Sequence, residues 1–140
     1  MTPQQIELVQ TSFAKVVPIA DAAAALFYGR LFEIAPEVRA MFPADLTEQR
    51  RKLVAALAMV VGGLKNLDAM LPAVKGLASR HVGYGVGAAH YAPVGEALIW
   101  TLQQGLGEDF TAETRQAWAS AYGLLAGVMI AEAYGEEAAA

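Results

Sequence analysis

The 140-residue sequence contains no cysteine, which excludes disulfides and thiolate metal sites within it. The net charge is −4, and no run of Lys or Arg is long enough to mark a nucleic-acid-binding surface. The longest apolar runs, Ala22–Tyr28 and Leu53–Val61, are too short to span a bilayer. The N-terminal residues MTPQQIELVQ lack the basic and apolar stretches of a secretory signal. We therefore expect a cytoplasmic protein with no membrane span and no nucleic-acid partner.

Strand patterns are also missing, because no stretch alternates apolar and polar residues convincingly. Helix signals recur instead, beginning with Thr2-Pro3-Gln4-Gln5, which combines an N-cap, a proline in the first turn and a capping-box glutamine. Further candidate caps and stops along the chain are Pro18, Asp21, Pro36, Asp45 with Glu48, Gly107 and Thr111. The sequence predicts one all-α domain over residues 1–140, with about 135–140 as a flexible tail.

The spacing of apolar residues predicts roughly six or seven helices, two of them short. After the two helices that precede Pro36, the expected segments are a short turn at Pro36–Phe42, a long helix at Leu46–Leu64, a loop at Asn66–Asp68, and helices at Leu71–Val82, Ala88–Leu106 and from Thr111 to about Tyr134. A plain up-and-down bundle has fewer and more equal helices. Short segments on both sides of a long one suit a fold that opens to hold a flat molecule.

Both histidines lie between Leu71 and Tyr91. Val74, Leu77 and His81 would share one helix face, and the glycines that follow would end that helix. The pattern presents an imidazole from an apolar stripe, where it can bind a metal. A partly buried core histidine with a hydrogen bond is the alternative on spacing alone. His90 is expected at the surface or half-buried at the start of the next helix.

A second group of candidate site residues contains Tyr28, Phe42, Gln49 and Leu53. Gln49 and Leu53 are four residues apart and so lie on one helix face. A hydroxyl and an amide beside apolar side chains can hydrogen-bond a small polar ligand. With a histidine on the opposite side, this is the composition that a haem pocket needs.

Four ordered stretches carry a family resemblance: FYGRLFEIAPEVRAMF (27–42), LPAVKGLASRHVGYGV (71–86), HYAPVGEAL (90–98) and AWASAYGLLAGVMIAE (117–132). They resemble the bacterial single-domain globins related to flavohaemoglobins, the group that includes Vitreoscilla haemoglobin. The resemblance covers nearly the whole chain. It implies a globin fold around haem b (iron protoporphyrin IX).

The resemblance also implies a role for each site residue. His81 matches the proximal iron ligand, and Phe42 matches the aromatic side chain that packs on the haem. Tyr28 and Gln49 match the distal residues that contact bound dioxygen and would be the catalytic ones. Leu53 matches the apolar residue that limits access. The resting sixth ligand of the iron stays open between water, Gln49 and Tyr28.

Other positions complete the expected pocket. Tyr91 and Glu132 match a hydrogen-bonded pair behind the proximal histidine, although Glu132 fits only with a one-residue offset. Further residues expected to line the cofactor are Leu57, Leu77, Tyr84, Val86 and Val94. Lys52 and Arg80 are candidates to pair with the haem propionates, with ordinary solvated charges as the alternative.

By resemblance, the expected activity is reversible O₂ binding and nitric oxide dioxygenation. Only a short Glu- and Ala-rich end follows Tyr134, so we expect no reductase domain and a separate reductase as partner. The expected ligands are O₂, NO and other small haem ligands, and the expected state is a monomer or weak homodimer. Two alternatives stay open: an O₂ carrier, store or gas sensor without turnover, and a haem-free interaction domain in which His81 is a core residue.

Overall fold

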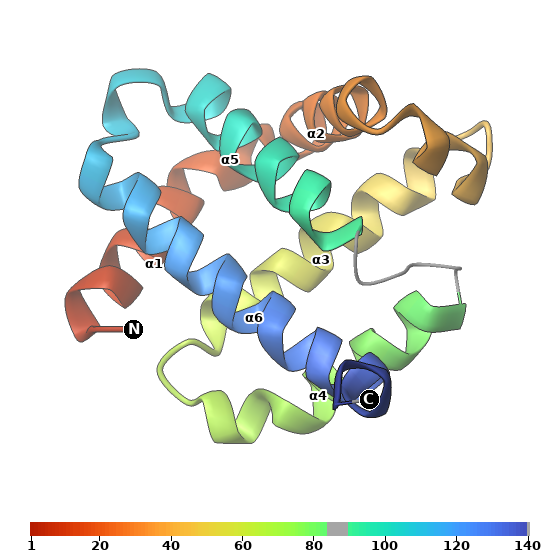
Figure 1. The fold of residues 1–140 in the computed structure, drawn as a ribbon. Helices are drawn as coiled ribbons and strands as arrows, with labels where there is room; N and C mark the ends of the chain where they lie inside the picture. Colours follow the sequence, from red (N-terminus) through yellow and green to blue (C-terminus); the bar gives the residue numbers. More distant parts are fainter. Residues whose placement is uncertain (84–89, 140) are drawn as a thin grey trace.

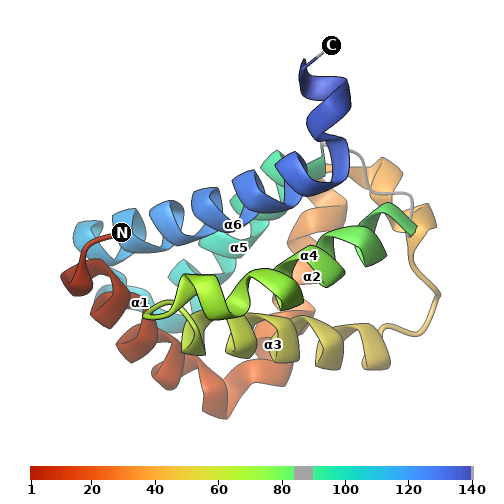
Figure 2. The ribbon, with the colours of Figure 1, turned by 90° about the horizontal axis from the view of Figure 1, so that it is seen from below.

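The computed structural model describes residues 1–83 and 90–139, and the side chains of these residues apart from 79–83 and 131–139. This part of the chain forms helices and 3-10 turns without a strand, as predicted (Figure 1). The elements are α1 (Pro3–Val16), η1 (Val17–Ile19), α2 (Ala20–Ile34), η2 (Pro36–Met41), α3 (Thr47–Gly62), α4 (Leu67–Gly83), α5 (Tyr91–Leu106), η4 (Gly107–Asp109) and α6 (Ala112–Ala139). In Figure 2, α3 and α6 lie on opposite sides of the molecule.

The start of α1 confirms the predicted capping box. The Thr2 hydroxyl accepts from the Gln5 N–H at 3.1 Å, and the Gln5 side chain accepts from the Thr2 N–H at 3.0 Å. The predicted cap at Asp21 is wrong, because α2 begins at Ala20 without a side-chain cap. Asp21 instead accepts from Arg50 of α3 at 3.3 Å, a tertiary contact that local sequence does not reveal.

The second predicted capping box, Asp45 with Glu48, is wrong, because the N-cap of α3 is Leu46 and no side chain caps this helix. The Asp45 carboxylate accepts from the Thr47 N–H at 2.9 Å and from its hydroxyl at 2.7 Å, just before the helix begins. Glu48 does not complete the box, because its carboxylate accepts from Arg51 at 3.3 Å.

The start of α4 differs from the prediction. The helix begins at Leu67 rather than Leu71, so the predicted loop at Asn66–Asp68 is shorter. The Asn66 side chain accepts from the Ala69 N–H at 3.4 Å and so caps the start of the helix. Pro72 therefore lies inside the helix rather than in its first turn. A proline there removes one backbone hydrogen bond, which the packing of α4 must offset.

The last two helices begin and end largely as predicted. Gly107 ends α5 with a φ of 56°, a conformation that favours glycine. The Thr111 hydroxyl accepts from the Thr114 N–H at 3.1 Å and caps α6. The backbone of α6 then continues to Ala139, five residues beyond the predicted end at Tyr134. α5 begins at Tyr91, and the predicted start at Ala88 lies outside the described residues.

By length and hydropathy alone, the segment Pro3–Ile34 could cross a membrane. The structure divides this segment into α1 and α2 at the turn around Pro18. Val9 and Phe27 of this segment are buried in the core, whereas Val17, Ile19 and Leu26 are exposed. Packing in the core therefore accounts for only part of the hydropathy of this segment.

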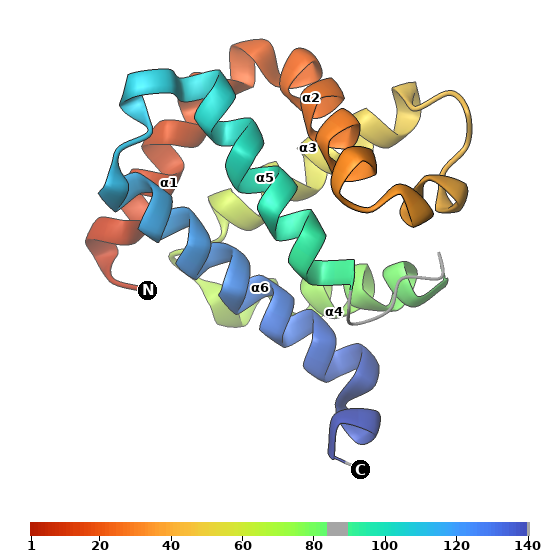
Figure 3. The ribbon, with the colours of Figure 1, turned by 45° about the horizontal axis from the view of Figure 1, so that its top comes forward.

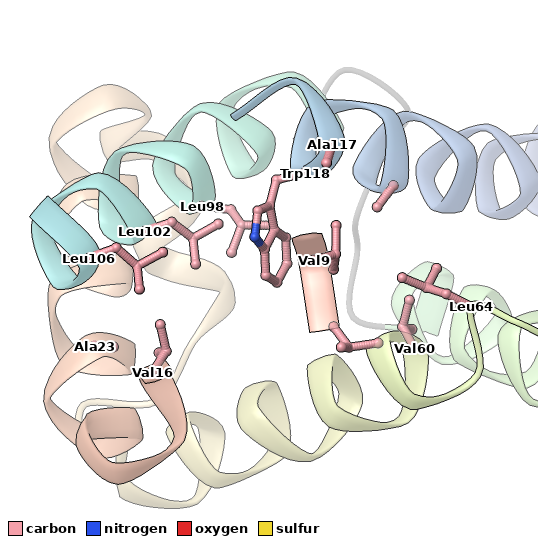
Figure 4. Packing of buried hydrophobic residues seen from close by; sticks show 12 residues of the cluster. Val9, Val16, Ala23, Val60, Leu64, Leu98, Leu102, Leu106, Ala117 and Trp118 are labelled. Carbon is pink, nitrogen blue, oxygen red and sulfur yellow. The ribbon is translucent and has the colours of Figure 1, made fainter. Parts of the chain in front are cut away.

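The largest apolar cluster lies between α1, α3, α5 and α6 (Figure 4). Its centre is Trp118 of α6, which is 3% exposed and tilted against Phe13 with ring centroids 6.3 Å apart. The indole N–H donates to the Ser12 hydroxyl at 2.8 Å, and that hydroxyl donates to the Leu8 carbonyl at 2.6 Å. One buried serine therefore joins α1 to α6 across the core.

We predict that Ser12→Ala lowers the free energy of unfolding by about 1–3 kcal/mol, because the buried indole N–H loses its acceptor. Urea unfolding measures this change. Thr11→Ala removes a hydroxyl from the exposed side of the same helix α1 and is the control, expected to cause no such loss. Equal stability of the two variants would refute the role of the Ser12–Trp118 bond.

Candidate functional site

One group of predicted site residues gathers where α2, η2, α3 and the start of α5 meet. We call it the Tyr28 cluster. Its buried members are Phe27, Tyr28, Leu31, Ala35, Val38 and Ala97, and its half-buried members include Phe32, Phe42, Leu53 and Val94. Tyr28 is 4% exposed, so its phenol lies inside this apolar group. The structure thus brings together Tyr28, Phe42 and Leu53, which the sequence analysis placed in one group, and adds Val94 of α5 to them.

Aromatic contacts fix the position of Tyr28. Its ring stacks on Phe27 at 5.0 Å between centroids and meets the edge of Phe42 at 5.5 Å. Phe32, one helical turn along α2, completes the group at 6.1 Å from Tyr28 and 5.6 Å from Phe42. Such edge-on and offset contacts are favourable beyond simple burial, so the ring of Tyr28 is held on several sides.

Arg39 holds the corner that carries Phe42, a role that the sequence analysis missed. Its guanidinium donates to the carbonyls of Phe42, Pro43 and Ala44 at 3.2, 3.1 and 3.4 Å. It also lies over the Phe32 ring, 5.1 Å from the centroid. A single side chain therefore ties the loop after η2 to the aromatic group.

The Tyr28 hydroxyl is a buried donor with a weak partner. It donates to the backbone carbonyl of Gln49 at 3.5 Å, the outer limit for a hydrogen bond. Burial raises the pKa of Tyr28, and the neighbouring Gln49 side chain offsets part of that rise. The phenol therefore keeps its proton at neutral pH and can donate to a better acceptor placed beside it.

The other α3 candidates separate into three environments. Gln49 is half-buried beside Tyr28, and Leu53 packs in the same cluster. Leu57 packs against the larger core instead. Leu53 and Leu57 also border an apolar cavity of about 30 Å³ shared with Phe27 and Trp118, so Leu57 connects the site to the core. Lys52 is exposed.

A second apolar group lies on α4, the start of α5 and α6, and we call it the Val74 cluster. Its buried members are Val74, Ala78, Tyr91, Ala126 and Met129, with Leu77 half-buried against them. Leu77 and Tyr91, both predicted site residues, therefore lie in a different group from Tyr28. The start of α5 contributes to both groups, Tyr91 to one and Val94 to the other.

Tyr122 of α6 fixes the first residue of α5. Its hydroxyl donates to the Tyr91 carbonyl at 2.5 Å. Burial first, and the nearby Tyr91 second, raise the pKa of Tyr122, so it remains a donor. The ring passes so close to α5 that a Cβ on Gly95 would lie 2.7 Å from it. The sequence analysis missed this anchoring role of Tyr122.

The remaining candidates lie at the edge of what the structure describes. His81 is in the last turn of α4, seven residues after Val74 and four after Leu77, which gives its backbone the predicted helix position. The side chains of Arg80, His81 and Glu132 lie outside the described residues, as do Tyr84 and Val86 entirely. His90 is half-buried just before α5, as predicted.

The Tyr28 cluster lies mainly on α2, η2 and α3, and the Val74 cluster lies mainly on α4 and α6, while the start of α5 belongs to both. Figure 3 shows how these helices are arranged. α3 packs against α2, whereas α4 packs against α6. In all three ribbon views, the first turns of α3 and the last turns of α4 lie at the same end of the molecule. The residues present fit the expected haem, because both groups are mainly apolar or aromatic and Tyr28 supplies a buried donor.

Comparison of the sequence with known proteins agrees with the globin resemblance. The model of the family described as Globin matches residues 25–129. The flavohemoprotein of Bordetella parapertussis is 34% identical over 133 residues, 93% of this chain and 33% of that protein. The flavohemoprotein of Chromobacterium violaceum is 35% identical over 107 residues, 74% of this chain and 26% of that protein. The chain thus spans about a third or less of these relatives.

Solved structures match over almost the whole chain. A bacterial globin from Campylobacter jejuni has a TM-score of 0.86 and 28% identity, with 98% of this chain and 99% of that one covered. An engineered carbene transferase from Rhodothermus marinus, whose parent is named as a proposed nitric oxide dioxygenase, has a TM-score of 0.87 and 30% identity. The alignment covers 99% of this chain and 97% of the Rhodothermus protein.

We predict that Gly95→Ala destabilises the fold, because the new methyl group would overlap the Tyr122 ring. Overpacking costs about 1–3 kcal/mol and outweighs the gain in helix propensity of up to about 1 kcal/mol. Gly123→Ala in α6 is the matched control, since no heavy atom lies within 4 Å of its added Cβ. Thermal unfolding should rank wild type between the two variants, and a stabilised Gly95→Ala would contradict the close contact.

Proposed function

Because the chain belongs to the globin family, we propose that it binds haem b, holds dioxygen reversibly and dioxygenates nitric oxide with electrons from a separate reductase. The observation that carries the proposal is the buried Tyr28 hydroxyl, a proton donor whose bond to the Gln49 carbonyl is 3.5 Å long. Such a donor can turn to a small polar ligand at little cost. The similarity to flavohemoproteins supports the same activity.

In this proposal, side chains of the Tyr28 cluster and of the Val74 cluster would hold the haem. His81 in the last turn of α4 would bind the iron, and Leu77, Val94 and Phe42 would supply apolar contacts to the cofactor. When bound, haem supplies the iron that holds dioxygen and the redox chemistry that converts nitric oxide and dioxygen to nitrate. The apolar side chains around Tyr28 exclude water, which strengthens each hydrogen bond made there.

Tyr28 and Gln49 would act on the ligand. The phenol donates a hydrogen bond to dioxygen, and the raised pKa of Tyr28 keeps the proton on the phenol rather than transferring it. The half-buried Gln49 amide can donate a second bond. Each bond contributes about 1 kcal/mol, which slows loss of the ligand. Leu53 beside them would restrict access to molecules of similar size.

The reductase would be a separate protein in the cytoplasm. The flavohemoproteins are about three times as long as the part that this chain matches, so their remaining portion has no counterpart in the alignment. The same observation favours a second candidate function, an O₂ carrier, store or gas sensor without turnover. The propionate pairs of Lys52 and Arg80, and a monomer or weak homodimer, belong to the proposal.

We predict that Tyr28→Phe speeds O₂ dissociation about five- to tenfold, the equivalent of one lost hydrogen bond of about 1–1.4 kcal/mol. Stopped-flow displacement of O₂ measures the rate. Carbon monoxide is the control ligand, because it carries little negative charge and its dissociation should change less. An unchanged O₂ rate would refute the role proposed for Tyr28.

Nitric oxide consumption separates the two candidate functions. With a supplied electron donor, we expect the protein to consume many equivalents of NO per haem while O₂ is present. Nitrate should appear in the same amount. Consumption that stops after one equivalent would instead favour the carrier or sensor.

A further inference from the structure

Charge is distributed unevenly along this acidic chain. Residues 47–83, which contain α3 and α4, carry six basic and two acidic side chains, a net charge of +4. Residues 90–140 carry one basic and seven acidic side chains, a net charge of −6. Lys65 lies between α3 and α4, so the two helices that carry Gln49, Leu53, Leu77 and His81 hold five basic and two acidic side chains, a net charge of +3.

The basic residues nearest the candidate site lie on α3 and α4. Arg50, Arg51 and Lys52 lie in the first two turns of α3, Lys75 at the middle of α4 and Arg80 in the last turn of α4. The start of α3 and the last turns of α4 lie at the same end of the molecule in all three ribbon views (Figures 1 to 3). We call this set the basic end. The exposed Lys65 follows the opposite end of α3 and is not part of it.

Ion pairs neutralise the basic end only in part. Arg51 pairs with Glu48 at 3.3 Å, but the Arg51 side chain is 74% exposed. Arg50 pairs with Asp21 at 3.3 Å. Exposed pairs of this kind are weak and exchange readily for other partners. Among the side chains that the structure describes, no carboxylate lies within ion-pair distance of Lys52.

A shallow groove adjoins these cations. Its volume is about 540 Å³, and it is lined by four apolar residues, by the acidic Asp21 and Glu48, and by Arg50, Arg51 and Lys52. A mixture of apolar and charged residues is usual in a protein–protein interface. The groove therefore suits a folded protein partner better than a bare chain of phosphates.

We propose that the basic end is the docking surface for an acidic electron-donor protein that carries a flavin. This inference rests on the proposed function and adds the partner's charge, its cofactor class and its place of contact. The donor loses one electron, and the ferric haem iron gains it and becomes ferrous. Docking beside Gln49 and Leu53 on α3, and beside Leu77 on α4, brings the donor close to the site. A nucleic acid would also meet the acidic residues 90–140, which disfavours it.

The charge asymmetry also orients the partner. An acidic protein is repelled by the net charge of −4 and attracted by the basic end, so it approaches productively in one orientation. Because exposed charges act through solvent, salt should weaken this steering. The screening length is about 30 Å at 0.01 M ionic strength and about 3 Å at 1 M.

The first test measures the second-order rate of haem reduction by a reduced acidic flavodoxin in a stopped-flow instrument. At low ionic strength, Arg51→Glu and Lys75→Glu should each slow reduction about three- to tenfold. Lys65→Glu makes the same charge change away from the basic end and should slow it less than twofold. At 0.5 M salt, wild type and the three variants should all be reduced by flavodoxin at similar rates. Equal slowing by Lys65→Glu would overturn the proposal, since it would show an effect of net charge alone.

Reduction by the neutral deazariboflavin radical distinguishes an effect of the substitutions on docking from an effect on the haem site itself. It should reduce wild type and the three variants at equal rates, because it carries no charge. Unequal rates with this radical would mean that the substitutions alter the site, which would also overturn the docking assignment.

A second measurement needs neither turnover nor haem. Oxidised flavodoxin is titrated into the ¹⁵N-labelled protein, and amide shifts are followed by NMR. Shifts confined to about residues 48–55 and 72–80, and lost in 0.5 M salt, support the basic end. Shifts centred on residues 108–115, or none at low salt, would refute it. Docking at the basic end of a protein that binds no haem would leave the docking surface standing, whereas electron delivery and the proposed function would both fail.

Discussion

α4 packs its buried face against α6 rather than against α3, and the candidate site depends on that choice of partner. Val74 and Ala78 are buried with Ala126 and Met129, so the apolar surface of α4 is satisfied without closing onto α3. α3 is held in turn by α2 and by the larger core around Trp118. α3 and α4 are thus stabilised by different neighbours, and the two clusters share only the start of α5. In the proposed function, a flat cofactor would contact both clusters without replacing the packing that holds these helices.

Among the described side chains of the two clusters, polar groups are few, and each is positioned by several contacts. Tyr28 is fixed by three aromatic neighbours, and its hydroxyl makes a long, 3.5 Å contact with the Gln49 carbonyl beside the Gln49 side chain. Burial without a strong partner costs free energy, which is common where a site is kept ready for a ligand. On the other side, Tyr122 makes a short bond to the Tyr91 carbonyl and positions α5. One tyrosine hydroxyl is thus committed to structure, and the other is left available.

The sequence correctly predicted helix ends that depend on the conformation and hydrogen bonds of neighbouring residues. The capping box at Thr2, the stop at Gly107 and the cap at Thr111 depend on neighbouring residues and are confirmed. Asp21 and Pro72 were misplaced, because Asp21 pairs with a residue 29 positions away and α4 gains its stability by packing. The resemblance brought Tyr28 and Phe42 together correctly. Arg39 and Tyr122 were missed because they bind backbone carbonyls, and a carbonyl acceptor leaves no mark in the sequence.

The central claim is that His81 holds haem iron from the last turn of α4. Absorption spectra during haem titration test it most directly, with His90→Ala as the matched control. The account predicts that wild type and His90→Ala bind one haem with the same Soret band. His81→Ala should lose that band position and much of the affinity, and imidazole added to His81→Gly should restore the spectrum. A His81→Ala protein with the wild-type spectrum and affinity would contradict the account.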